Sequence, residues 1–310
     1  MDEKNYEVVA IGAGPTALTA AIYTTREDIE TVLLEKGVIG GLAATTDWID
    51  NYPGFPDGIS GIDLAENLRK QAERFNAKID LAEVTDIDSA GGLVRLQTTD
   101  GLINAKAVLI ATGSDYKKLG IPGEAEYYAR GVHYCATCDG AFYRDKKIVV
   151  VGGGNSAVQE ALFLTKFASS VDLLVRSDKF RASDVLLHEL EKNDKIKVHM
   201  NTTTDEILGG EQFVTKVIGT DKTAGKKVEF EVEGVFIFIG LLPNTQFLRG
   251  KIELDEIGLI KTNDRLETNL PGVYAAGDVR SGATMQIASA VGEGATAALR
   301  IREYLDTLPS

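Results

Sequence analysis

The hydrophobic positions of this chain repeat one pattern at two places far apart in the sequence. At the first place, Glu7–Ile11 is a short apolar run of the kind that forms a buried strand, and Leu18–Arg26 is typical of a helix. The segment between them, Gly12–Ala17, has the spacing Gly-x-Gly-x-x-Ala. A second apolar run, Glu30–Glu35, follows the helix. This order predicts a strand, a tight turn, a helix and a second strand.

The same order recurs downstream. Lys147–Val151 is an apolar run, Gly152–Ala157 has the same glycine spacing, and a helical stretch continues to about Phe167. Ser170–Val175 then supplies the second strand. Such strand–turn–helix–strand units are the start of a Rossmann-like dinucleotide-binding domain. Two of them predict two such domains.

Three further apolar runs are expected to form additional strands in the sheets of these two domains: Ala107–Gly113, Val235–Gly240 and Gly272–Asp278. The last of these follows the second repeat, although nothing in that repeat requires it. The simplest arrangement is a second domain inserted into the first. We therefore expect an α/β fold with two three-layer ββα domains. The expected first domain is residues 1–116 with 247–310, and the inserted domain is residues 117–246.

Composition supports a globular protein of about two domains and excludes several other classes. The chain has 310 residues, of which 44% are hydrophobic, 25% are charged and 32 are glycine. This composition excludes a disordered tail, a collagen-like fibre and a coiled coil. The net charge is −13, so nucleic acid is not an expected partner.

The apolar stretch from Val8 to Tyr23 lies close to the N-terminus but does not fit a targeting signal. Acidic residues precede it where a secretory signal needs positive charge. It is also too short to span a bilayer, and glycines interrupt it. We expect a cytoplasmic, soluble protein that keeps its N-terminus and has no membrane partner.

The glycine turns predict phosphate contacts. Their glycines let a pyrophosphate approach the backbone at a helix N-terminus, where N–H groups are unpaired. The expected cofactor-binding residues of the two turns are Gly12, Gly14, Pro15, Thr16 and Ala17, and Gly152, Gly154, Asn155, Ser156 and Ala157. In the first unit, Glu35 lies 23 residues after Gly12, where a Rossmann unit places the acid that binds a ribose hydroxyl. The alternative is a solvated strand end.

The second unit ends in a basic segment instead. Arg176, Ser177 and Arg181 follow its second strand. A guanidinium pairs with a 2′-phosphate that a carboxylate would repel, so this segment predicts a phosphorylated nicotinamide dinucleotide. The alternative is an exposed basic turn on an acidic protein.

The two cysteines, Cys135 and Cys138, lie just before the second glycine turn. Residues three apart on a helical turn are neighbours, close enough for a disulfide. If the pair opens a helix, the helix N-terminus would stabilise a thiolate. A structural role is unfavourable because closing so short a ring removes little unfolded-state entropy. A metal site would need two more ligands, and the chain has three histidines, His133, His188 and His199.

We therefore expect Cys135 and Cys138 to be redox-active and expect no metal. Asp139 adjoins the pair and is either the proton donor for a leaving thiolate or a carboxylate that complements the helix dipole. His133 is expected to be a solvated loop residue, and we assign it no role. A flavin would join nicotinamide chemistry to a dithiol, because it accepts a hydride and can reduce a disulfide. FAD is allocated to the first unit and NADPH or NADH to the second.

Over essentially its whole length the chain resembles the low-molecular-weight thioredoxin reductases, which are FAD-dependent and of class II of the pyridine nucleotide-disulfide oxidoreductases. Cys-Ala-Thr-Cys-Asp-Gly between two Rossmann-like units is highly specific for them. The motifs that carry the resemblance are Gly12–Ala17, Asp50–Phe55, Cys135–Gly140, Gly152–Ala157 and Ala275–Val279.

The resemblance implies roles for the matching residues. Cys138 would face the flavin, Cys135 would attack the disulfide of thioredoxin or a thioredoxin-like protein, and Asp139 would be the acid/base. It also implies a homodimer and a swing of the inserted domain. Glu35 would bind the FAD ribose, and the further residues expected near FAD are Gly40, Gly41, Asn51, Gly113, Gly277, Asp278, Gln286 and Ile287.

Two positions depart from this family. Its His-Arg-Arg-x-x-x-Arg phosphate signature is matched by Val175–Arg181, in which Val175 and Ser177 replace the histidine and one arginine. NADPH specificity therefore stays open against NADH or dual use. Its Arg-Gln pair near the C-terminus is Met285-Gln286 here.

Several alternatives remain at this point. The electron donor could be ferredoxin or a deazaflavin, and the carrier a peroxidase-coupled or glutaredoxin-like protein. Two alternatives are not enzymes: a flavin redox sensor, which would bind flavin without turnover, and a zinc-binding module.

Overall fold

The structure is a computed structural model that describes residues 4–46, 48–49 and 51–309. The chain forms two compact units, Met1–Asp115 with Leu242–Ser310, and Tyr116–Leu241. It passes between them within a pair of short strands, β7 (Ser114–Tyr116) and β16 (Leu241–Pro243), which hydrogen-bond to each other.

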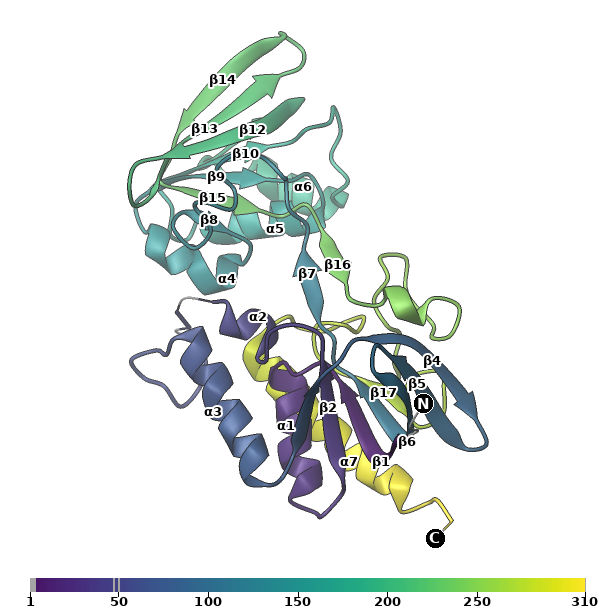
Figure 1. Ribbon diagram of the computed structural model, residues 1–310. Coiled ribbons are helices and arrows are strands. Elements are labelled where there is room, and N and C mark those ends of the chain that lie inside the picture. Colours follow the sequence, from purple (N-terminus) through teal and green to yellow (C-terminus); the bar gives the residue numbers. More distant parts are fainter. Residues whose placement is uncertain (1–3, 47, 50, 310) are drawn as a thin grey trace. The chain divides into compact units, whose positions relative to one another are not determined.

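The first unit is built on a parallel sheet (Figure 1). β1 (Lys4–Ile11) lies between β2 (Thr31–Glu35) and β6 (Gly101–Ile110), β3 (Lys78–Leu81) pairs with β2, and β17 (Val273–Ala275) pairs with β6. The apolar residues expected at the ends of β1 and β2 are buried. These strands confirm the predicted first repeat.

β6 begins six residues before the apolar run that predicts it, because its first half has a different partner. That half pairs with β5 (Leu93–Thr98), which forms an antiparallel hairpin with β4 (Val84–Ala90). Only its second half, from Val108, pairs with β17. One strand thus serves both the parallel sheet and the hairpin.

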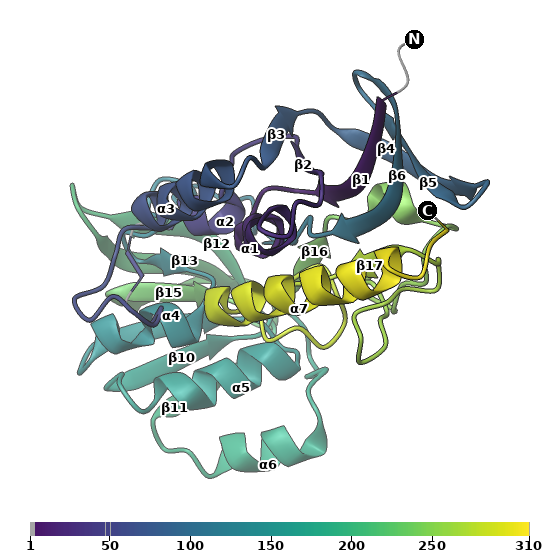
Figure 2. The same cartoon turned by 90° about the horizontal axis from the view of Figure 1, so that it is seen from below.

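Helices cover one face of this sheet (Figure 2). They are α1 (Pro15–Thr25), α3 (Gly61–Arg74) and the long α7 (Ile287–Leu305), while α2 (Gly41–Ala44) is a single turn. α1 is rich in alanine and buries most of its residues, because it packs against the sheet and against both α3 and α7. On the opposite face, the β4–β5 hairpin and the loop after η2 (Gln246–Leu248) enclose a second cluster.

The second unit has a five-stranded parallel sheet in the order β11-β10-β9-β15-β8. The bounds of these strands are β8 (Val132–His133), β9 (Lys147–Val151), β10 (Ser170–Leu174), β11 (Ile196–His199) and β15 (Gly234–Ile237). α5 (Asn155–Leu164) and α6 (Asp184–Glu191) cover one face. α5 follows the second glycine turn as predicted and ends three residues before the predicted Phe167.

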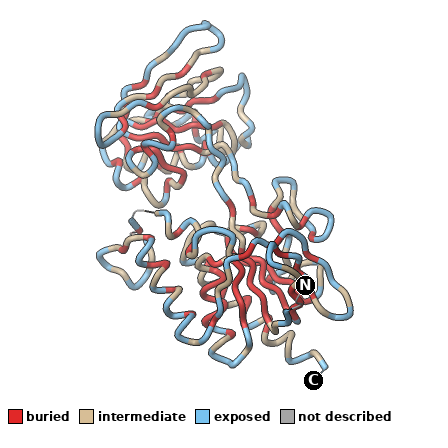
Figure 3. The backbone as a smooth tube through the Cα atoms, in the orientation of Figure 1, coloured by how far each residue is buried: buried red, intermediate tan, exposed pale blue. Residues whose placement is uncertain are grey.

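An antiparallel sheet covers the other face of the second unit. It consists of β12 (Thr202–Gly209), β13 (Val214–Asp221) and β14 (Lys226–Glu231). The resulting order of layers is sheet, sheet and helices, which confirms the predicted ββα arrangement. Figure 3 shows that the buried backbone of each unit is concentrated in its central strands. The short helices α4 (Ala136–Asp139) and η1 (Gly140–Tyr143) connect β8 to β9.

Candidate active site and dinucleotide sites

The first glycine turn is shaped for close approach of a ligand. Gly12 has φ of +105°, and a Cβ at this position would lie 2.6 Å from the Ala111 carbonyl oxygen. Gly14 is the N-cap residue of α1 and has open space where a side chain would be. Pro15, Thr16 and Ala17 form the first turn of that helix. The N-terminus of an eleven-residue helix, with its unpaired N–H groups, is therefore open on the side of Gly14.

Glu35 is tied to this turn rather than solvated at a strand end. Its Oε2 accepts a hydrogen bond from the Ala13 N–H at 2.8 Å, and its Oε1 accepts one from the Gly37 N–H at 2.7 Å. Each carboxylate oxygen keeps a second lone pair, so the side chain can still accept from a ribose hydroxyl.

A cavity of about 340 Å³ opens beside Gly12 and Glu35. It is suited to one end of a dinucleotide, because apolar side chains such as Ile11, Val84 and Phe247 lie there beside polar and charged ones. Sequence reasoning missed most of its lining, which comes from the loop before β4, from the end of β6 and from the segment after β16. The additional lining residues include Ala82, Glu83, Val84, Thr85, Thr112, Asn244 and Phe247.

Other expected FAD residues gather at the same turn. The Gly40 N–H donates to the Ala13 carbonyl oxygen at 2.8 Å, and a Cβ on Gly41 would be 3.6 Å from the Gly14 Cα. Gly277 packs against the Thr16 side chain so closely that a Cβ would lie 2.3 Å from its hydroxyl oxygen. The first glycine turn, Gly40, Gly41 and Gly277 thus lie together and form one cradle.

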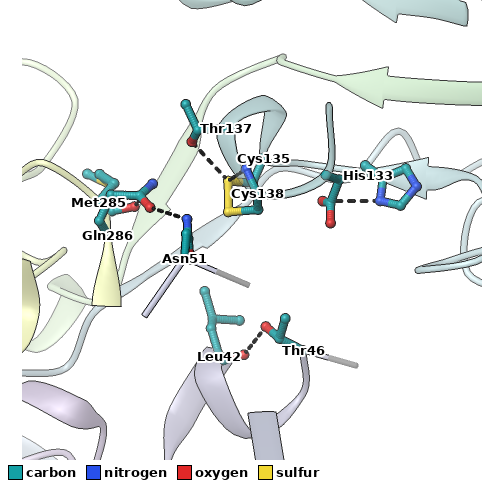
Figure 4. The surroundings of a disulfide bond; sticks show 10 residues. Leu42, Thr46, Asn51, His133, Cys135, Thr137, Cys138, Met285 and Gln286 are labelled. Carbon is teal, nitrogen blue, oxygen red and sulfur yellow. Dashed lines mark hydrogen bonds and ion pairs between the residues drawn. A yellow bond between two sulfur atoms is a disulfide. The ribbon is translucent and has the colours of Figure 1, made fainter. Parts of the chain in front are cut away.

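Asn51 and Gln286 also meet. The Asn51 side-chain amide donates to Gln286 Oε1 at 3.2 Å (Figure 4). Gln286 is the N-cap residue of α7 and Ile287 is the first residue of that helix. Asp50, the first residue of the predicted 50–55 motif, lies outside the described residues.

Asp278 is a largely desolvated carboxyl. Burial, together with the charge of Glu293, raises its pKa to about 6. Within the described residues its side chain has no hydrogen-bond partner, although its backbone carbonyl accepts from the Ser114 hydroxyl at 2.5 Å. Gly113, with φ of +66°, immediately precedes Ser114. A desolvated carboxyl of this kind fits a ligand that donates a hydrogen bond.

The second glycine turn has the same build. Gly152 has φ of +145°, and a Cβ there would lie 2.3 Å from the Phe238 carbonyl oxygen. Gly154 is the N-cap residue of α5 and is open, and Asn155, Ser156 and Ala157 form the first helical turn. Asn155 Oδ1 accepts from the Ser183 N–H at 2.8 Å.

The basic segment after β10 lies against this turn. The Arg181 N–H donates to the Gly153 carbonyl oxygen at 2.7 Å. Arg176, Ser177 and Arg181 are exposed, and the Ser177 hydroxyl donates to the Lys179 carbonyl oxygen at 2.8 Å. Lys222 Nζ donates to the Arg176 carbonyl oxygen at 2.7 Å, which adds a cation that the sequence pattern did not indicate.

Cys135 and Cys138 form a disulfide with 5.3 Å between their Cα atoms (Figure 4). Both are half-buried. Cys135 is the N-cap residue of α4, and its Sγ accepts from the Cys138 N–H at 3.2 Å. Since α4 is only one turn long, its dipole is small, so the expected stabilisation of a thiolate by a helix N-terminus is weaker than the sequence implied.

His133 is not the solvated loop residue that the sequence led us to expect. It lies on β8, is 8% exposed, and is stacked on Phe236 with 5.1 Å between ring centroids. Its Nδ1 is 3.1 Å from Asp139 Oδ2, as drawn in Figure 4, and its Nε2 is 2.6 Å from the Tyr143 hydroxyl. The prediction was wrong because parallel pairing with β15 draws residues 132–133 into the sheet.

Among the described residues, no three or more His, Cys, Asp or Glu side chains are grouped in a way that could hold a metal ion. None of the helices in the described part of the chain is both long and apolar enough to cross a membrane.

Known proteins resemble this chain over nearly all of its length. The thioredoxin reductase of Bacillus subtilis is 41% identical over 307 residues, covering 99% of this chain and 97% of that protein. The thioredoxin reductase of Treponema pallidum is 41% identical over 306 residues, covering 99% of each. The crystal structure of thioredoxin reductase from Streptococcus pyogenes matches with a TM-score of 0.94 at 40% identity, covering 99% of this chain and 100% of that one.

The family model for pyridine nucleotide-disulphide oxidoreductases matches residues 6–294, which include both glycine turns and the disulfide. With the match extending over most of the chain, and with a disulfide and two dinucleotide-type turns in place, the chain belongs to the pyridine nucleotide-disulphide oxidoreductase family.

Proposed function

We propose that this chain is a thioredoxin reductase, an enzyme that passes electrons from NADPH or NADH through FAD and the Cys135–Cys138 pair to thioredoxin or a thioredoxin-like protein. The observation that carries this proposal is the disulfide itself, between two half-buried cysteines three residues apart. The relatives support it, because those at about 40% identity over the full length are thioredoxin reductases.

FAD belongs to the first unit. The cradle of Gly12, Gly14, Gly40, Gly41 and Gly277 would hold its pyrophosphate at the N-terminus of α1, which is open beside Gly14. Glu35 would accept from the adenosine ribose, next to the 340 Å³ cavity. The desolvated Asp278 carboxyl would accept from the ligand, and Asn51, Gln286 and Ile287 would line its other end. When bound, FAD accepts a hydride from a nicotinamide and supplies an electron pair to a disulfide.

The nicotinamide dinucleotide belongs to the second unit. Gly152, Gly154 and the first turn of α5 would hold its pyrophosphate. Arg176 and Arg181 are exposed beside this turn and would bind a 2′-phosphate as guanidinium groups do. Ser177 cannot supply a third charge, so we infer that the preference for NADPH over NADH is weaker than three arginines would give.

The two sulfurs then carry out thiol–disulfide exchange. In the reduced chain, the Cys135 thiolate attacks one sulfur of the thioredoxin disulfide, and the other thioredoxin sulfur leaves as a thiolate. The Cys138 thiol gives its proton to the Asp139 carboxylate and attacks Cys135 Sγ. This step breaks the mixed disulfide, restores the Cys135–Cys138 bond and releases the second thioredoxin sulfur as a thiolate. Asp139 then gives up the proton it took from Cys138, and with a proton from water the released thioredoxin becomes a dithiol.

We also propose a homodimer and a cytoplasmic location, as the family resemblance implies. The domain assignment follows the same reasoning: residues 1–116 with 247–310 would bind FAD, and residues 117–246 would bind the nicotinamide dinucleotide and carry the cysteines.

The test is reduction of oxidised thioredoxin by the FAD-loaded protein with NADPH and, separately, with NADH. We expect turnover with at least one of them, read as loss of nicotinamide absorbance that requires thioredoxin. Ferredoxin and a reduced deazaflavin are the comparison donors. If thioredoxin is reduced only with ferredoxin or the deazaflavin, the proposed electron donor is wrong, but the proposed dithiol chemistry stands. If thioredoxin is reduced with none of the four donors, the proposed function is wrong.

A further inference from the structure

His133, Asp139 and Tyr143 form a chain of polar contacts within the second unit: an ion-pair distance joins His133 to Asp139, and a hydrogen bond joins it to Tyr143. Asp139 Oδ2 lies 3.1 Å from His133 Nδ1, and His133 Nε2 lies 2.6 Å from the Tyr143 hydroxyl oxygen. His133 and Tyr143 are 8% and 6% exposed, while the Asp139 side chain is 23% exposed. The chain therefore runs from a fully covered phenol to a carboxylate that still reaches solvent, next in sequence to Cys138.

The donor and acceptor roles along this chain follow from chemistry. An ionised carboxylate can only accept, so the proton shared with Asp139 Oδ2 must be on His133 Nδ1. In a neutral imidazole the other nitrogen is then an acceptor. The Tyr143 hydroxyl supplies the donor that Nε2 needs, and burial together with the charge of Asp139 raises the pKa of Tyr143, so this phenol keeps its proton.

The packing around the imidazole fixes its orientation. The ring is stacked on Phe236, which is fully buried, and Tyr143 meets it edge-on with 5.2 Å between ring centroids. β8 and β15 hold His133 and Phe236 in register across the sheet. A ring stacked on one face and in polar contact at both nitrogens cannot turn without losing several of these contacts.

We propose that His133 is a positioning residue for Asp139: its Nδ1–H holds Oδ2, so that the other carboxylate oxygen is left to exchange a proton with the Cys138 thiol, and the Tyr143 hydroxyl donates to Nε2 in the same tautomer. The inference rests on the acid/base role of Asp139 in the proposed function. The balance is one proton from the Cys138 thiol to Asp139, while the Cys138 sulfur bonds to Cys135 Sγ and thioredoxin leaves as a thiolate. His133 holds its own proton throughout.

Two amide variants separate positioning from packing. In His133→Asn the amide nitrogen can take the place of Nδ1 and donate to Asp139. In His133→Gln the amide takes the place of Nε2 and reaches Tyr143 instead. Both variants keep a polar amide in a buried place, so a purely structural role predicts similar losses for both.

The measurement uses the FAD-loaded full chain. It is reduced with dithiothreitol, freed of excess reductant and mixed with oxidised thioredoxin, and the thioredoxin dithiol is followed after rapid acid quench. We expect His133→Gln to lower the maximal rate about ten- to a hundredfold, which is at or below the lower end of the roughly 10²–10⁴-fold that general acid–base catalysis contributes, because Asp139 itself is still present. We expect His133→Asn to stay within about threefold of the unmodified chain, and the thioredoxin concentration for half-maximal rate to be unchanged in both.

A second readout does not depend on activity or on the folding of the histidine variants. Nitrogen NMR of the histidine-labelled chain should show the His133 proton on Nδ1. Tyr143→Phe keeps the ring but removes the hydroxyl that donates to Nε2, and we expect the Nε2 resonance to shift while the proton stays on Nδ1, where Asp139 accepts it.

The outcomes distinguish this inference from the proposed function. Equal rates for His133→Asn and His133→Gln, or a proton on Nε2 in the unmodified chain, would overturn the inference alone. An unchanged rate in Asp139→Asn would remove the acid/base role and the inference with it, while thioredoxin reduction would stand. A chain that reduces no thioredoxin at all would overturn the function itself.

Discussion

Glu35 Oε2 accepts a hydrogen bond from the Ala13 N–H at 2.8 Å, which joins the acid at the end of β2 to the glycine turn after β1. The side chain is thus held in place before any ligand binds. We expect Glu35→Gln to weaken FAD binding about tenfold, because its amide group would place a donor where a carboxylate oxygen accepts. Flavin fluorescence on titration with FAD measures this. Glu30→Gln, at the other end of the strand, is the control and should bind FAD normally.

Cys135→Ser and Cys138→Ser should each abolish reduction of thioredoxin, because a serine hydroxyl cannot form a disulfide. FAD should still bind, since the cradle that would hold it is in the first unit. The assay is thioredoxin-dependent oxidation of the nicotinamide donor, together with the flavin absorbance of the purified variants. Sustained turnover in either variant would contradict the dithiol mechanism.

Gly294 in α7 lies against α1, and a Cβ there would be 2.3 Å from the Thr16 carbonyl oxygen. Gly294→Ala should therefore lower the free energy of unfolding by about 1–3 kcal/mol, because the two helices must separate to admit the methyl group. It should also weaken FAD binding, since Thr16 belongs to the glycine turn. Gly292→Ala in the same helix meets open space and should be neutral or stabilising by up to about 1 kcal/mol. Urea unfolding of both variants makes the comparison.

Ser177→Arg should improve NADPH relative to NADH about ten- to a hundredfold in KM, which corresponds to one charged hydrogen bond of about 1.5–3 kcal/mol to phosphate. The substitution removes the Ser177–Lys179 hydrogen bond within the loop, which affects both dinucleotides. The ratio of the two KM values is therefore the quantity to compare. Thr307→Arg adds the same charge in the first unit and should leave the ratio unchanged. No change in Ser177→Arg would mean that this loop does not bind the 2′-phosphate.

The pKa of Asp278, about 6, lies above the ordinary 3.8 of an aspartate. Between these pH values the folded flavin-free chain holds a proton that the unfolded chain has lost, so this group makes stability fall as pH rises through the window. By pH 7.5 the loss amounts to about 3 kcal/mol, which Asp278→Asn should remove. Urea unfolding at pH 4 and pH 7.5 measures the difference. Asp264→Asn changes an exposed carboxyl and should follow the unmodified chain.

The local features of the fold could be predicted from the sequence. Gly12 and Gly152 are required by turns with positive φ, and Glu35 lies at the end of an apolar strand at the expected spacing. The closeness of Cys135 and Cys138 also follows from three residues of chain. These features depend on covalent geometry and on neighbours along the sequence, so a pattern is enough to find them.

The tertiary structure decided what depends on residues far apart in the chain. His133 is a lone polar residue in the sequence, and only its pairing with Phe236 in the sheet buries it and turns it toward Asp139. The contact of Gly294 with Thr16 and the hydrogen bond from Asn51 to Gln286 join segments more than 200 residues apart. Burial and hydrogen-bond partners of this kind are set by how strands and helices pack, and no spacing along the chain encodes them.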